Sequence, residues 1–229
     1  MHSVIQRSLS MAAGLFVLAG CAGMPGGGGS EMTFFVTSAG PGNGADLGGL
    51  EGADKHCQTL AAAAGAGNRT WRAYLSTQGD ALNDPKVVHA RDRIGAGPWH
   101  NAKGVRIARN VEDLHSARSN VTKETALDEM GRMVNGRTEK PNKHDILTGS
   151  RPDGTAHPPT AGGRFPDQTC GNWTKSGEGS AMTGHHDRGG PINHPWATSW
   201  NSAHPTIGCS QDAITKTGGA GLFYCFAAK

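Results

Sequence analysis

The stretch Gly48–Ser76, GGLEGADKHCQTLAAAAGAGNRTWRAYLS, predicts a short helix followed by a strand. Apolar residues recur at helical spacing and form one face, made of Ala53, Cys57, Leu60, Ala61 and Ala64. Gly65 is a suitable helix end. Trp71, Ala73 and Leu75 then alternate with Arg72, Tyr74 and Ser76, which is typical of a strand with two different faces. Because Cys57 lies on the apolar face of the helix, it requires a partner from elsewhere in the chain.

The composition indicates a loop-rich domain with a modest core. The chain has 229 residues, of which 36% are hydrophobic and 35 are glycine. This length allows one domain or two small ones. A domain of this kind often depends on covalent cross-links. The net charge of +3 is small, and basic residues are scattered among acidic ones. The sequence therefore does not predict a nucleic-acid partner.

The N-terminus carries an export signal. Arg7 precedes a short apolar run, Met11–Leu18, which ends in Leu18-Ala19-Gly20-Cys21. The run is too short to span a membrane. This pattern resembles a bacterial lipoprotein signal, in which Cys21 becomes the lipidated first residue. We therefore expect a signal peptide (1–20), a lipidated Gly-rich tether (21–31) and one domain (32–229), anchored by lipid to the outer membrane or cell surface.

The remaining four cysteines predict two disulfides. They are Cys57, Cys170, Cys209 and Cys225, and spacing alone leaves all three pairings open. A zinc site made of cysteines is disfavoured, because the chain has no Cys-x-x-Cys pair and exported proteins meet an oxidising environment.

Further elements follow from local patterns. Strands are expected at 32–37, at 104–108 with Val105 and Ile107 facing the core, at 169–174, at 181–184 and at 221–227. One helix is expected at 125–134, with Leu127, Met130, Met133 and Val134 on one side. The segment from His185 to Gly208 is rich in Gly, Pro and His, and is expected to form a long irregular loop.

An ordered set of short motifs resembles a known family. It comprises Gly52-Ala53-Asp54, Cys57, Arg72–Ser76, Gly97-Pro98-Trp99, Gly104–Ile107, Asn120-Val121-Thr122, Thr148-Gly149, Asp153-Gly154-Thr155, Cys170, Trp173, Trp200, Cys209 and Leu222–Phe226. The set resembles bacterial exported C-type-lectin-like proteins related to the endostatin domain of collagen. The resemblance implies an α+β, C-type-lectin-like fold with two small antiparallel sheets, one or two helices, a long loop region and the disulfides Cys57–Cys225 and Cys170–Cys209.

The long loop contains candidate binding residues. His185, His186, Asp187 and His204 are suitable metal ligands, although no His-Glu-x-x-His pattern is present. They could instead form a hydrogen-bonded scaffold for the loop. Trp196 and Trp200 could stack on a sugar ring, with a structural role favoured for Trp200 because it matches a family position. The calcium-binding tripeptides of sugar-binding C-type lectins do not occur, so calcium-dependent sugar binding is not expected.

These observations favour a binding module over an enzyme. We expect a lipid-anchored, lectin-like module that recognises a glycan or an envelope or extracellular protein, with His185, His186, Asp187, Trp196 and Trp200 as ligand-binding candidates. One alternative is a metal-dependent hydrolase that uses His185, His186, Asp187 and His204; another is a structural envelope lipoprotein. No Gly-x-Ser-x-Gly motif is present and no catalytic residue is assigned. The only cofactor considered is a divalent metal at the histidine cluster.

Overall fold

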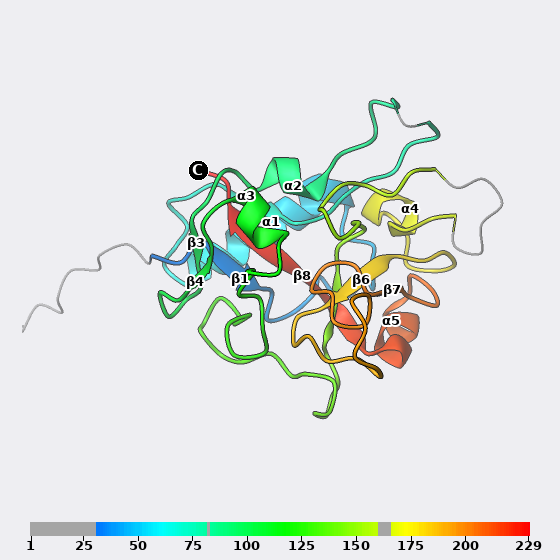
Figure 1. Ribbon diagram of the computed structural model, residues 1–229. Helices are drawn as coiled ribbons and strands as arrows, with labels where there is room; N and C mark the ends of the chain where they lie inside the picture. The colour runs from blue at the N-terminus through cyan, green and yellow to red at the C-terminus, as the bar shows by residue number, and fades with distance from the viewer. Residues whose placement is uncertain (1–30, 82, 160–165) are drawn as a thin grey trace, which may run out of the picture.

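Strand β8 (Gly219–Ala227) is the centre of the fold (Figure 1). Its second half pairs antiparallel with β1 (Phe34–Val36) on one side and β2 (Trp71–Ala73) on the other. Its first half pairs in parallel with β5 (Asp145–Leu147), which continues the sheet into β6 (Met182–His185) and β7 (His204–Pro205). The computed structural model describes residues 31–229 apart from 82 and 160–165. The predicted signal peptide, Cys21 and nearly all of the tether lie outside this range.

The sheet is covered on both faces because the side chains of β8 alternate between two apolar clusters. Phe223 and Cys225 join the cluster that contains the helix α1 (Gly49–Ala63), whereas Tyr224 and Phe226 join the cluster on the opposite face. All four are fully buried. A strand that is buried on both faces is expected to be almost continuously apolar, as this one is.

Helix α1 forms where the apolar spacing predicts it, and two side chains attach it to the sheet. Cys57 forms a disulfide with Cys225 in β8, with the Cα atoms 5.7 Å apart. Asp54 accepts a hydrogen bond from the backbone N–H of Ala73 in β2 at 2.9 Å. Tyr74, expected on the same face as Arg72 and Ser76, is fully buried in the second cluster, whereas Arg72 is exposed. The strand is also shorter than expected, because β2 ends at Ala73.

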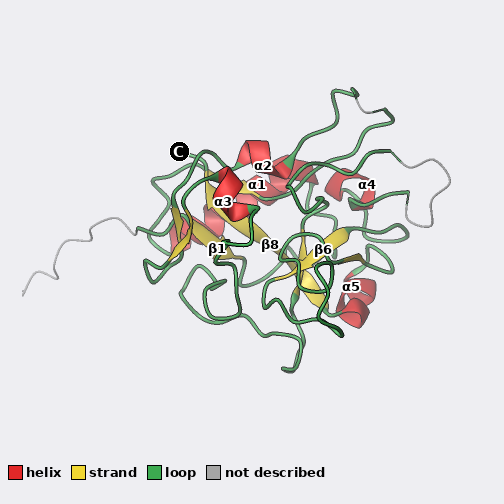
Figure 2. Cartoon of the chain, viewed as in Figure 1, coloured by secondary structure: helices red, strands yellow, loops and turns green. Residues whose placement is uncertain are grey.

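The other helices are short and the rest of the described chain is mostly loop (Figure 2). They are α2 (Ala90–Arg93), α3 (Val111–Leu114), α4 (Cys170–Trp173) and α5 (Gln211–Thr217). A separate two-stranded sheet consists of β3 (Trp99–His100) and β4 (Arg106–Ala108). Helix α5 was not predicted, although Ser210 caps its first turn and Gly218 ends it in a left-handed conformation.

The strand expected at 169–174 is wrong, because this segment forms the helical turn α4. All four of its residues have positive φ, between 49° and 67°. Gly171 and Asn172 tolerate this conformation better than most residues. The hydroxyl of Thr169 accepts a hydrogen bond from the backbone N–H of Asn172 at 3.1 Å. The disulfide Cys170–Cys209 fixes the turn against the loop that precedes α5.

The helix expected at 125–134 is also wrong. The carboxylate of Asp128 accepts hydrogen bonds from the backbone N–H groups of Met130 and Arg132, which favours a turn over a helix. Met130 and Met133 are therefore exposed rather than buried, at 58% and 60%. In the strand expected at 104–108, Ile107 is buried but Val105 is 43% exposed, because β4 begins only at Arg106.

The coarse fold prediction is confirmed: the chain is α+β, with small sheets, few helices and two disulfides. The cysteines pair as the resemblance implies. The described residues do not, however, form two antiparallel sheets. The long strand β8 joins β1, β2 and β5 into one six-stranded mixed sheet, with β3 and β4 apart from it. Among the described residues, no helix has the length and apolar character that a membrane span requires.

Candidate functional site

Strand pairing brings three chemically active side chains to one face of the sheet. Asp145 in β5 lies opposite His185 in β6, and Thr183 in β6 lies opposite His204 in β7. Since Thr183 and His185 are two residues apart, their side chains point to the same face. His204 is therefore a diagonal neighbour of His185. The sequence separates these residues by up to 59 positions, and only the sheet register places them together.

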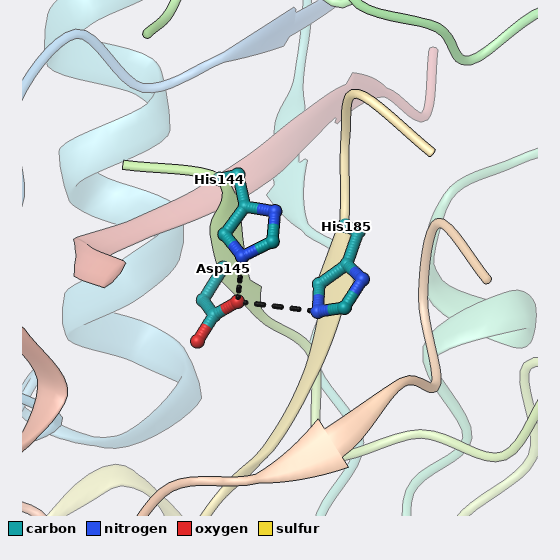
Figure 3. A group of neighbouring side chains, drawn as sticks. All are labelled: His144, Asp145 and His185. Atoms are coloured by element: carbon teal, nitrogen blue, oxygen red, sulfur yellow. Dashed lines mark ion pairs between the residues drawn. The ribbon is translucent and has the colours of Figure 1, made fainter. Parts of the chain in front are cut away.

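Three imidazoles surround one carboxylate oxygen. The Oδ1 atom of Asp145 lies 3.1 Å from Nε2 of His144, 3.3 Å from Nε2 of His185 and 3.5 Å from Nε2 of His204. Figure 3 shows the rings of His144 and His185 turned toward the same oxygen. These two rings stack with centroids 4.2 Å apart, and the ring of His204 packs edge-on against His185 at 5.0 Å. The group formed by His144, Asp145, His185 and His204 is called the His/Asp cluster below.

The cluster is buried except on one side. Asp145 and His185 are each 1% exposed, whereas the side chain of His204 is 31% exposed. Within the described part of the chain, neither carboxylate oxygen of Asp145 has a hydrogen-bond partner, and neither does Nε2 of His185. The short distances between these atoms are therefore close approaches without aligned hydrogen bonds. Buried polar atoms are rarely left in this state.

Each histidine of the cluster is oriented through its other ring nitrogen. The Nδ1 atoms contact oxygen acceptors as follows: His144 contacts Oδ1 of Asp187 at 3.2 Å, His185 the carbonyl of Ala197 at 2.6 Å, and His204 the carbonyl of Pro205 at 3.2 Å. Because carbonyl and carboxylate oxygens only accept, each Nδ1 atom carries the proton. In the neutral rings, the lone pair is then on Nε2, which faces Asp145.

Asp187 supports the cluster from outside. Its Oδ2 accepts a hydrogen bond from the backbone N–H of Arg137 at 2.7 Å, and its Oδ1 accepts one from Gly189 at 2.9 Å. Burial tends to raise the pKa of Asp187, but the contact with His144 and the two N–H groups outweigh it and hold the pKa well below its usual range. Asp187 is therefore a carboxylate that positions His144.

The charges within the cluster depend on one another. Burial tends to raise the pKa of Asp145, but the three imidazoles outweigh it and hold the pKa well below its usual range. Burial tends to lower the pKa of His144, but Asp145 and Asp187 outweigh it and raise the pKa to about 9. The pKa of His204 is raised by its contact with Asp145. The carboxylate is thus the charged centre to which the imidazoles respond.

The structure brings some of the predicted metal ligands together and leaves one apart. His185 and His204 belong to the cluster, and Asp187 reaches it through His144. His186 points elsewhere: its Nε2 atom contacts the carbonyl of Asn135 at 3.1 Å, and burial lowers its pKa to about 4. His186 is therefore not a member of the cluster, because it lies just beyond the end of β6 and its ring is directed at Asn135.

Sequence reasoning missed His144 and Asp145, which lie in a charged segment before an apolar run. A signal was present. A His-Asp pair spans the start of the strand Asp145–Leu147, and a His-His-Asp sequence begins at the last residue of the strand Met182–His185. An antiparallel pair of these two strands necessarily brings the two polar groups together.

The two tryptophans of the long loop have separate roles. Trp200 is only 3% exposed and packs against Tyr74 and Tyr224, with ring centroids 4.9 Å and 5.2 Å away. Its assignment to ligand binding is therefore wrong, since the core covers its ring. Trp196 is 41% exposed and Ile192 is 55% exposed. Both belong to the 186–203 loop, which connects β6 to β7.

Within the described residues, one group meets the distance requirement for a metal site. The ligand atoms of His144, Asp145 and His185 all lie within 4.8 Å of one another. Imidazole and carboxylate ligands suit zinc and related transition metals. The arrangement could therefore hold a metal ion.

Comparison with models of known protein families gives no match for this sequence, and comparison with curated proteins gives none either.

Proposed function

We propose that this chain is a binding module of the cell envelope that recognises a glycan or an extracellular protein through its 186–203 loop. The observation that carries the proposal is the exposed tryptophan on this loop. Trp196 is 41% exposed, and Ile192, four residues earlier on the same loop, is 55% exposed. Binding residues are often found on loops that a rigid scaffold positions, and aromatic rings supply much of the contact energy.

The loop is well anchored, which favours binding. The guanidinium group of Arg188 lies at its start and donates to the carbonyls of Val121, Thr198 and Ser119 at 2.8, 3.3 and 3.4 Å. Burial lowers the pKa of Arg188. A loop held in place before the ligand arrives loses less conformational entropy on binding.

The fold and the N-terminal sequence support the location and class of the module. The α+β architecture, the disulfides Cys57–Cys225 and Cys170–Cys209 and the long 186–203 loop agree with a C-type-lectin-like domain. The Leu18–Cys21 sequence supports export and attachment by lipid at Cys21. The chain would then present its loop from the outer membrane or the cell surface.

Array binding tests this function. The folded, disulfide-bonded domain is applied to a glycan array and to an array of envelope and extracellular proteins. We expect one class of ligand to bind and Trp196→Ala to weaken that binding about 10-fold or more, as is typical of an aromatic anchor. Met133→Ala is the matched control, since Met133 is 60% exposed but outside the loop. Absence of any hit, or equal loss in both variants, contradicts the proposal and favours a structural envelope protein.

A metal-dependent hydrolase is the second candidate, and the possible metal ligands His144, Asp145 and His185 favour it. Burial counts against it, because Asp145 and His185 are 1% exposed and leave a substrate little access. Chromogenic ester and phosphoester substrates distinguish the two functions. Turnover that requires zinc and is lost in Asp145→Asn would establish the hydrolase; equal background rates with and without zinc would exclude it for these substrates.

A further inference from the structure

No described residue makes an aligned hydrogen bond to the buried carboxylate of Asp145. Both of its carboxylate oxygens are buried and lack hydrogen-bond partners within the described residues, and Nε2 of His185 lies 3.3 Å away in the same condition. An unsatisfied buried carboxylate is costly to the folded state. A buried carboxylate without an aligned hydrogen bond calls for an explanation, and a bound ion is one recognised explanation.

The orientation of the histidines indicates that a bound ion would be positively charged. The Nδ1 atoms of His144 and His185 are directed at oxygen acceptors, so the neutral rings present Nε2 lone pairs to Asp145. When both rings are neutral, as metal ligands must be, these lone pairs face a carboxylate at 3.1–3.3 Å and repel it. A cation between them turns this repulsion into three favourable bonds. Protonation of the rings is the other remedy, and a metal ion would displace that proton on binding.

The distances from Oδ1 of Asp145 to the imidazole nitrogens match those around a small transition-metal ion. Zinc binds histidine nitrogen and carboxylate oxygen at about 2.0–2.1 Å in a tetrahedron, which places neighbouring ligand atoms about 3.3 Å apart. The Oδ1 atom of Asp145 lies 3.1, 3.3 and 3.5 Å from the three Nε2 atoms. Calcium and magnesium prefer sites made of oxygen ligands, which this cluster does not provide.

We propose that His144 Nε2, Asp145 Oδ1 and His185 Nε2 bind one Zn²⁺-class divalent ion, with His204 beside the fourth ligand position. The outer contacts fit this assignment. Zinc-binding histidines commonly donate their other N–H to a carboxylate or a backbone carbonyl, as His144 does to Asp187 and His185 does to Ala197. These contacts fix both the tautomer and the ring orientation.

A glycine beside the cluster leaves space for the ring of His144. A Cβ atom at Gly218 would lie 3.2–3.3 Å from the imidazole of His144, and Gly218 also has a φ of 114° that other residues rarely adopt. On the open side, the side chain of His204 is 31% exposed and provides a route by which an ion can enter.

The ion would have a structural effect on the 186–203 loop. His185 immediately precedes this loop and His204 immediately follows it, so a metal bonded near both would fix its two ends to β5. The metal site would exist whether or not the loop binds a glycan or protein, and the two proposals can fail separately.

Zinc titration tests the site directly. The oxidised domain is freed of metal with a chelator, then titrated with Zn²⁺ by calorimetry, and its metal content is measured by elemental analysis. We expect one Zn²⁺ per chain, a raised thermal unfolding midpoint and, with Co²⁺ as the probe, the visible absorption of a tetrahedral complex. Ca²⁺ and Mg²⁺ should give none of these effects.

Variants locate the ion within the chain. Asp145→Asn and His185→Ala should lose one-to-one zinc binding, and Asp187→Asn should weaken it about 10–100-fold through the orientation of His144. His194→Ala, on the same loop but outside the cluster, is the control and should bind as the wild type does. Near-ultraviolet circular dichroism establishes that each variant is folded. If Asp145→Asn does not fold, His185→Ala and Asp187→Asn provide the test.

Two results would overturn the proposal. One is a folded, oxidised wild-type protein that binds no Zn²⁺. The other is zinc binding that is unchanged in the folded cluster variants or is lost in His194→Ala, because the ion would then be bound elsewhere.

Discussion

Cys57 and Cys225 join the middle of helix α1 to the central strand β8, with their Cα atoms 5.7 Å apart. The bridge links positions 168 residues apart, whereas Cys170–Cys209 links positions only 39 apart. One cross-link therefore closes nearly the whole domain and the other closes a local loop.

This difference predicts unequal effects on stability. Replacing both Cys57 and Cys225 with Ala should lower the free energy of unfolding by about 2–5 kcal/mol. Replacing Cys170 and Cys209 should cost about 1.3 kcal/mol less, from the logarithmic dependence of chain entropy on loop length. Denaturant unfolding of both double variants measures the difference. A larger loss for the Cys170 and Cys209 pair would contradict the entropic account.

Two arginines that share one carboxylate should differ in importance. Arg93 and Arg72 each lie 2.7 Å from Oδ2 of Asp54, but their side chains are 11% and 45% exposed. Arg93→Met removes the buried partner of Asp54 and leaves it only the exposed Arg72, so it should cost about 3 kcal/mol. Arg72→Met should cost under about 1 kcal/mol, because solvent screens that pair. Chemical denaturation compares the two, and equal losses would show that burial does not separate them.

Gly184 should not tolerate a side chain. A Cβ atom there would lie 1.9 Å from the carbonyl oxygen of Trp200. Gly184→Ala should therefore push the 186–203 loop away from β6 and reduce the free energy of unfolding by about 1–3 kcal/mol. Gly177→Ala is the control, because a Cβ atom at Gly177 meets nothing within 4 Å. Unfolding followed by tryptophan fluorescence measures both, and a wild-type midpoint for Gly184→Ala would contradict the packing described.

His115 should make the fold sensitive to acid. Its Nδ1 donates to the carbonyl of Val111 and its Nε2 accepts from the hydroxyl of Tyr74, both at 2.7 Å, so the neutral ring satisfies both contacts. Burial lowers the pKa of His115 from its usual value near 6.5. The unfolded state then binds the proton more readily than the folded state does. Stability is therefore fully present above that value and decreases as the pH falls below it.

The variant His115→Gln isolates this contribution. Between about pH 7 and about pH 5, the wild type should lose more stability than the variant. The reason is that His115 binds a proton more readily in the unfolded state than in the folded state, whereas glutamine does not titrate. Urea unfolding at each pH gives the comparison. Parallel pH profiles for the two proteins would remove His115 as the cause.

Lipid attachment at Cys21 has a separate test. In a bacterial host that processes lipoproteins, Cys21→Ala should move the protein from the membrane fraction to the soluble fraction, because the lipid is the only anchor expected. Mass spectrometry of the mature wild-type N-terminus should show an acylated cysteine. Continued membrane retention of Cys21→Ala would contradict the anchor.

Locally encoded elements could be predicted from the sequence. The helical spacing of Ala53, Cys57 and Ala61 placed α1, and all three are buried. The apolar run that ends the chain placed β8. In both cases the signal lies within a single stretch, because the side-chain period of the element itself decides which residues are buried.

Elements that depend on distant contacts could not be predicted in this way. Asp145 belongs to the cluster because β5 pairs with β6. The residues next to Asp145 in the sequence do not indicate that pairing. The turn at α4 depends on Asn172, whose amide oxygen accepts from the backbone of Gln78, 94 residues away. Asp128 prevented the expected helix, because its carboxylate accepts hydrogen bonds from nearby backbone N–H groups. The spacing of apolar residues gives no information about such side-chain hydrogen bonds.

The two ends of β8 lie at different distances from the start of the described chain. The backbone N–H of Ala227 bonds to the carbonyl of Thr33, so the last strand ends beside the point where the tether enters, and Figure 1 shows the C-terminus on that side. Gly219, at the other end of β8, pairs with Asp145. The eight residue steps from Gly219 to Ala227 span roughly 27 Å. The His/Asp cluster therefore lies about one strand length from the end of the domain at which the described chain begins, so a partner held at that end would not cover it.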